Sequence, residues 1–216
     1  MGEKIETALT RLIGVLPLKA KQEACGAQIK KLHQAVLRSF VERGRILTRQ
    51  EMGGHVDDLE AAIDALKSND MVVFSESGDP VGAYPFTMEV REHNVRINGH
   101  EVHAMCALDA LAISPMFGMT SHISSTCRVT GEPVQIEQSG ETIENFEETG
   151  DVRFGIIWGA ANACSCCADS LCMEMMFIKD GSVAAQWLAE DPHNREIFSL
   201  AEAIDFGARF FVPLMQ

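Results

Sequence analysis

The sequence lacks long apolar runs, an excess of basic residues and the loops typical of nucleotide-binding enzymes. No uncharged apolar stretch reaches the length of about 18 residues that a membrane span needs, and no apolar run follows a basic start as in a secretory signal. Neither a Gly-rich phosphate loop nor a Gly-x-Ser-x-Gly turn occurs. We therefore expect a cytoplasmic protein with no membrane partner.

Basic residues are scarce, with 18 Lys and Arg against 31 Asp and Glu, for a formal net charge of −13. Such a surface repels phosphate backbones and anionic lipid headgroups. Nucleic acid is therefore not an expected partner.

Cysteine is present in an odd number, seven, so at least one thiol cannot pair within the chain. The cysteines cluster instead of forming a spaced disulfide framework, which favours free thiols in a reducing compartment. The length of 216 residues and an apolar share of 46% suit one large domain or two small ones with a real core.

The first 90 residues are typical of helices followed by a hairpin. Apolar spacing predicts helices over 4–16 and 27–43, Thr48 with Glu51 predicts a capping box, and another helix begins at Asp57 or Asp58. The predicted strands are 71–74 and 81–90. This order resembles a winged helix-turn-helix, which would suggest DNA binding. Because the second helix of the motif is acidic, we favour a scaffold of that shape, over residues 1–90, that does not bind DNA.

The sequence of residues 91–216 predicts a second domain, with both helices and strands. Asn98-Gly99 is a strong signal for a tight hairpin, and a short helix over 106–113 is expected to end at Pro115. Further strands are expected at 121–129, 133–138, 152–158, 173–179 and 196–199, an acidic loop at 139–151, and helices at 182–190 and 200–211. The expected fold class is α+β, with an antiparallel sheet carrying the chemistry.

Cys106 and Asp109 are one helical turn apart and share a helix face. A helix N-terminus favours a thiolate at Cys106, whereas the carboxylate of Asp109 raises the pKa of that thiol. The conflict suits a site in which an arriving metal drives deprotonation and Asp109 accepts the proton. Taken alone, the motif is better interpreted as a buried cysteine beside a surface aspartate.

Four more cysteines lie within nine residues: Cys164, Cys166, Cys167 and Cys172. Their spacing fits a zinc knuckle poorly, because zinc sites usually pair two Cys-x-x-Cys units across a longer loop. A thiol site for a soft metal fits better. The methionines that follow, at 173, 175 and 176, are weak thioether donors for which core packing is the favoured role.

Several motifs together resemble the organomercurial (alkylmercury) lyase family over roughly residues 28–215. They are Cys106-Ala-Leu-Asp109, Ser124-Ser-Thr-Cys127, Thr130-Gly-Glu-Pro133, Ser170-Leu-Cys172, Trp187 and the closing segment Phe198–Ala203. One departure is Met173, where some members carry a second cysteine.

The resemblance implies protonolytic cleavage of a carbon–mercury bond to a hydrocarbon and Hg(II), serving mercury detoxification. Cys106 and Cys172 would be the catalytic thiols, Asp109 the proton carrier, and Cys127 a buried structural thiol. The same three catalytic residues would hold Hg(II) transiently. This chain departs from the family in adding Cys164, Cys166 and Cys167 upstream, and of these Cys166 and Cys167 are further candidate ligands. No cofactor is expected; external small thiols would release the product, and a mercuric reductase is a candidate partner.

Two other functions are open at this stage. A thiol-rich metal chaperone on the same scaffold would bind soft metals without breaking a bond, as the cysteine cluster allows. A metal-responsive transcription regulator would use the winged-helix order, and the acidic helix argues against it.

Overall fold

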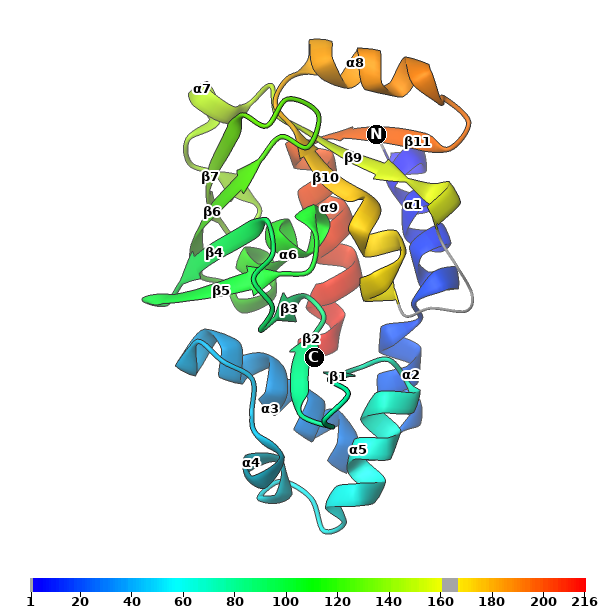
Figure 1. The fold of residues 1–216 in the computed structure, drawn as a ribbon, viewed down its shortest axis with the longest axis vertical. Coiled ribbons are helices and arrows are strands. Elements are labelled where there is room, and N and C mark those ends of the chain that lie inside the picture. The colour runs from blue at the N-terminus through cyan, green and yellow to red at the C-terminus, as the bar shows by residue number, and fades with distance from the viewer. Residues whose placement is uncertain (1, 161–166) are drawn as a thin grey trace.

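The computed structural model describes residues 2–160 and 167–216. Its strands form two antiparallel sheets, and its helices pack around them (Figure 1). The helices are α1 (Gly2–Val15), α2 (Leu18–Ala24), α3 (Gly26–Arg43), α4 (Arg49–Gly53), α5 (Leu59–Ser68), α6 (Ala107–Phe117), α7 (Phe146–Thr149), α8 (Gly181–Glu190) and α9 (Leu200–Phe211). The strands are β1 (Val73–Phe74), β2 (Pro80–Ala83), β3 (Phe86–Thr87), β4 (His93–Ile97), β5 (His100–Ala104), β6 (Thr120–Thr126), β7 (Pro133–Ser139), β8 (Thr142–Ile143), β9 (Arg153–Ile157), β10 (Met175–Ile178) and β11 (Arg195–Ser199). The predicted α+β class is confirmed.

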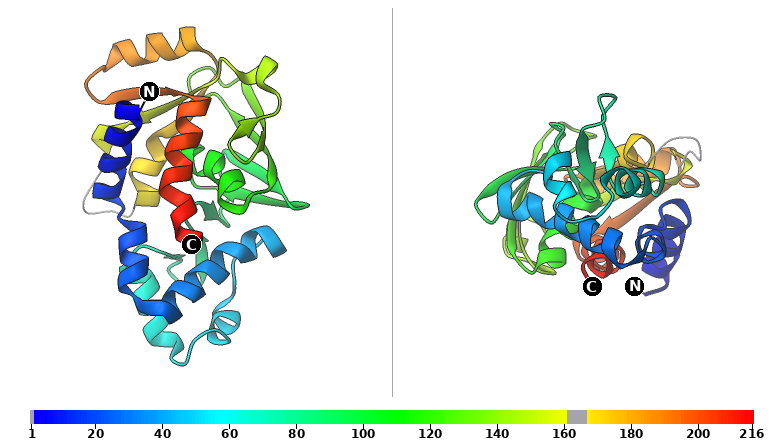
Figure 2. Two further views of the ribbon diagram at one scale, coloured as in Figure 1. Left: turned by 180° about the vertical axis from the view of Figure 1, so that it is seen from behind. Right: turned by 90° about the horizontal axis from the view of Figure 1, so that it is seen from below.

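The larger sheet has the order β1-β2-β3-β5-β4-β6-β7-β8, and the smaller one the order β10-β9-β11. Helices α2 to α5 gather at one end of the molecule, with α8 and the smaller sheet at the other (Figure 1). Helix α9 packs against both α6 and α1, and Figure 2 shows α1 and α9 side by side. Helix α6 is thereby enclosed between the sheet and α9, which is why most of its residues are buried.

Local sequence signals account for several element boundaries. Thr48 and Glu51 form the expected capping box, Asp58 caps α5, and Gly44 ends α3 in the left-handed conformation. Asn98 and Gly99 both have positive φ between β4 and β5, as a tight hairpin turn requires. The predicted capping box, the predicted start of a helix at Asp58 and the predicted hairpin turn are thus confirmed.

Other boundaries differ from expectation. The strand predicted over 81–90 is split into β2 and β3 at Tyr84-Pro85, because proline has no N–H to donate to a ladder. Helix α6 continues through Pro115 to Phe117. Pro115 cannot bond the carbonyl of Leu111, and that carbonyl instead accepts from Gln138 Nε2 at 2.8 Å. Helix α2 was not expected, and the acidic loop contains β8 and α7.

Among the described residues, no helix combines the length and apolar character needed to cross a bilayer.

Candidate functional site

Cys106 lies where the chain passes from the larger sheet into helix α6. It follows β5 and is the N-cap residue of α6, with extended backbone angles. Its Sγ accepts the N–H of Asp109 at 3.4 Å, as a capping side chain does. The expected position at a helix N-terminus is confirmed, and the thiol is almost fully buried, with 1% of its surface exposed.

Asp109 lies in the first turn of α6 and points into the protein, not to solvent. It is 1% exposed, and its Oδ2 has no hydrogen-bond partner among the described residues. Burial raises the pKa of this carboxyl from 3.8 to about 7, against the opposing charge of Arg91. A carboxyl with that pKa can both accept and donate a proton near neutral pH.

Cys172 comes from a distant part of the sequence, in the 3₁₀ turn η3 (Leu171–Glu174) before β10, and is 4% exposed. The ligand atoms of Cys106, Asp109 and Cys172 all lie within 4.8 Å of one another. In the part of the chain that the structure describes, this is the one group of three or more His, Cys, Asp and Glu side chains close enough to hold a metal ion together.

Both thiols of this group are protonated at rest. Burial raises the pKa of Cys106 to about 12, and the carboxylate of Asp109 acts in the same direction. The neighbouring thiols of Cys106 and Cys167, together with burial, raise the pKa of Cys172 well above its ordinary value. An incoming soft metal must therefore displace protons from sulfur.

Cys167 adjoins Cys172, with the two Sγ atoms 3.4 Å apart. It lies in the 3₁₀ turn η2 (Cys167–Asp169) and is 4% exposed. Tyr84 fixes this turn, because its hydroxyl accepts the N–H of Ala168 at 2.9 Å. The other two clustered cysteines, Cys164 and Cys166, lie outside the described residues.

The methionines of this region divide between packing and contact with the site. Met175 and Met176 are buried in β10, as core residues would be, whereas Met173 is 46% exposed. The Cys106 thiol also donates to Met175 Sδ at 3.5 Å, so one packing methionine touches the site. Cys127 is fully buried, as expected of a small core residue.

A small apolar cavity of about 10 Å³ lies beside the two thiols and the carboxyl, with room for about one water molecule. The wall of the cavity includes Leu12 from helix α1 and Leu16, which directly follows that helix. The end of α9 contributes Phe210 and Phe211. Sequence reasoning missed these four residues. Their apolar spacing predicts burial, but nothing in the pattern tells which cavity a buried side chain faces.

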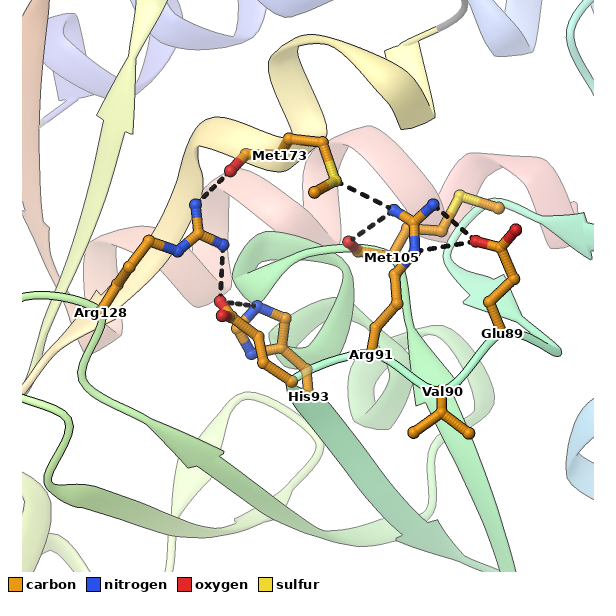
Figure 3. A pocket seen from close by; sticks show the side chains of 8 residues that line it. Glu89, Val90, Arg91, His93, Met105, Arg128 and Met173 are labelled. Atoms are coloured by element: carbon orange, nitrogen blue, oxygen red, sulfur yellow. Dashed lines mark hydrogen bonds and ion pairs between the residues drawn. The ribbon is translucent and has the colours of Figure 1, made fainter.

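A larger and open pocket of about 600 Å³ lies close by and is lined in part by Met105 and Met173, the sequence neighbours of the two thiols (Figure 3). Arg91 donates to Met173 Sδ at 3.5 Å and to the carbonyl of Ala168 at 3.2 Å. Neither thiol nor Asp109 lines this pocket. Arg91 connects the two regions, since its charge acts on Asp109.

Comparison with known proteins identifies the family of the chain. A family model described as alkylmercury lyase matches residues 86–212. The alkylmercury lyase of Bacillus cereus is 24% identical over 207 residues, which span 94% of this chain and 91% of the relative. The alkylmercury lyase of Streptomyces lividans is 23% identical over 172 residues, or 79% of this chain and 78% of the relative.

The fold is also shared with a solved structure, the mercury-bound form of MerB2. It superposes with a TM-score of 0.72 at 18% identity, over 92% of this chain and 98% of that one. The family model covers more than half of the sequence. On that match, the chain belongs to the alkylmercury lyase family.

Proposed function

We propose that the protein is an organomercurial lyase, which cleaves the carbon–mercury bond of alkyl and aryl mercury compounds by protonolysis. The observation that supports this most directly is the grouping of two buried thiols and a buried carboxyl within 4.8 Å, beside a small cavity. Mercury favours soft thiolate ligands. The carboxyl, with its pKa raised to about 7, is suited to handling the protons that those ligands release.

The first step is exchange at sulfur. The organomercury cation R–Hg⁺ binds the sulfur of Cys106 or Cys172, and that thiol gives its proton to the carboxylate of Asp109. Because the raised pKa values of both thiols favour their protonated forms, binding of mercury to sulfur must release a proton. The second thiol then adds as a thiolate and releases its proton to solvent.

The second step breaks the carbon–mercury bond. Two thiolates raise the electron density on carbon, and Asp109 delivers the proton it holds to that carbon. The products are R–H and Hg(II) bound to Cys106 and Cys172, so one of the two thiol protons ends on carbon and the other leaves. A positioned acid contributes on the order of 100- to 10,000-fold to such a proton transfer. Mercury is substrate and product here, and the mechanism uses no cofactor.

The wider setting follows from the same chemistry. Small external thiols would take Hg(II) from the buried pair, and a mercuric reductase would be a suitable recipient in a mercury-detoxifying cytoplasm. The acidic net charge of −13 supports a protein that does not bind nucleic acid or anionic membranes. We assign residues 1–90 a scaffold role, with the winged-helix order of elements but no DNA function.

A second candidate is a soft-metal chaperone that binds organomercury without cleaving it. The contact of Cys167 with Cys172 favours it, because a third thiol adds binding capacity. Headspace analysis of benzene after addition of phenylmercury separates the two functions. A lyase releases benzene, whereas a chaperone retains the compound and releases none.

Variants of the site test the mechanism in that assay. Cys106→Ser should abolish benzene release, since a hydroxyl is a poor ligand for mercury. Asp109→Asn should still bind mercury but turn over on the order of 100- to 10,000-fold more slowly. Cys25→Ser is the matched control, because Cys25 contacts Asn69 and lies outside the site. Full activity in Cys106→Ser would refute the mechanism, and normal turnover in Asp109→Asn would remove Asp109 as the proton carrier.

A further inference from the structure

We propose that Cys172 and Cys167 form a second two-thiol site, to which Hg(II) passes after the carbon–mercury bond is broken. The inference rests on the proposed function, since it concerns the product of that reaction. Its structural basis is the 3.4 Å separation of the two Sγ atoms, both on side chains that are 4% exposed.

Cys172 lies close to Cys106 and Asp109 and also contacts Cys167. Cys106 and Asp109 lie at the N-cap and on the first turn of α6, and Cys172 is close to both. Cys167 contacts Cys172 and lines the same small cavity. Cys172 is therefore a member of both pairs, and Hg(II) can exchange one sulfur for another while it stays in the cavity.

The position of Cys167 is fixed from two directions. The turn that carries it is held at Ala168, whose N–H donates to the Tyr84 hydroxyl at 2.9 Å and whose carbonyl accepts from Arg91 at 3.2 Å. Tyr84 in turn donates to Asp70 at 3.2 Å. These bonds hold the turn that places the Cys167 thiol against Cys172.

The transfer is a ligand exchange without change of oxidation state. The Cys167 thiol loses its proton as its sulfur binds Hg(II), the bond from mercury to Cys106 breaks, and the Cys106 thiolate takes up a proton. Atoms and charge balance with no added oxidant or reductant. The exchange returns Cys106 to its protonated resting form beside Asp109, while Cys172 keeps the metal.

The test uses inorganic Hg(II), so it does not depend on lyase activity. The full chain carries Cys164→Ser and Cys166→Ser, so that neither residue can supply sulfur. One equivalent of Hg(II) is added, and X-ray absorption spectroscopy counts the Hg–S bonds. With Cys106→Ser added, we expect two bonds, from Cys172 and Cys167. With Cys106→Ser and Cys167→Ser together, we expect one Hg–S bond from the protein. A small dithiol added as a competitor should then remove the metal from this variant.

Controls keep the test decisive. Cys25→Ser in place of Cys167→Ser should retain two bonds, and Cys167→Ala should reproduce the loss if the serine variant does not fold. A single Hg–S bond in the Cys106→Ser protein, or two bonds that survive removal of Cys167, would overturn the proposal. Benzene release by the wild-type protein is measured separately, so failure of the lyase function is distinguishable from failure of the second site.

Discussion

The buried carboxyl of Asp109 should make the stability of the protein fall as the pH rises. In the unfolded chain this group ionises around its ordinary pKa of 3.8, whereas in the folded protein it holds its proton up to about 7. Below pH 3.8 both states are protonated and the group has no effect. Between the two pKa values the folded state binds more protons than the unfolded state, so stability declines with rising pH.

The size of the effect follows from the two pKa values. Each rise of one pH unit between the two pKa values lowers the free energy of unfolding by about 1.36 kcal/mol. Between pKa values of 3.8 and about 7, the loss sums to about 4 kcal/mol and is complete above pH 7. Such a loss is a large part of the 5 to 15 kcal/mol that is roughly typical of a folded domain.

The Asp109→Asn variant isolates this contribution. Asparagine has nearly the same shape and no titration, so the difference in unfolding free energy between variant and wild type should change by about 4 kcal/mol from about pH 4 to about pH 8. Urea denaturation at a series of pH values measures it, and titrating groups that do not interact with Asp109 cancel in the difference. A difference that stays constant with pH would show that the carboxyl ionises around its ordinary pKa in the folded protein, which would refute the raised pKa.

Two further substitutions test contacts that position the site. Tyr84→Phe leaves the N–H of Ala168 without its partner, and the protein should lose about 1–3 kcal/mol of stability in urea denaturation; an unchanged midpoint would mean that the hydroxyl does not hold the turn of Cys167. Gln138→Leu should cost a similar amount, about 1–3 kcal/mol, because it removes the donor to the carbonyl of Leu111 that Pro115 leaves unbonded. Adding Pro115→Ala to the Gln138→Leu variant should restore part of that loss, since alanine supplies the missing N–H, and no recovery would contradict the proposed compensation.

The sequence predicts local features of the fold well, because the signals for them lie within a few residues. The Asn98-Gly99 turn and the Thr48 capping box are examples, and so is the position of Cys106 at a helix N-terminus. The continuation of α6 through Pro115 could not be predicted, because it depends on Gln138 from a different element. Local pattern cannot reveal a partner that only the folded chain brings close.

In the candidate site, too, local sequence signals identify residues but not the contacts that folding brings about. Residue types and spacing single out Cys106 with Asp109, and the resemblance adds Cys172, but the distance between the two thiols depends on how β10 is placed beside α6. The raised pKa of Asp109 depends on enclosure by residues from the whole chain. The spacing alone favours a surface aspartate at this position, and that interpretation is wrong because α9 and the sheet cover both sides of α6.

The walls of the cavity set a mechanical condition for turnover. The space beside the two thiols has room for about one water molecule, so under the proposed mechanism its apolar wall, which includes Leu12, Leu16, Phe210 and Phe211, must move when a substrate binds. These residues belong to the first and last long helices or adjoin them, so a fusion partner or cross-link that ties α1 to α9 would slow entry without touching a reacting atom. Such a tether would slow bulky aryl compounds more strongly than methylmercury.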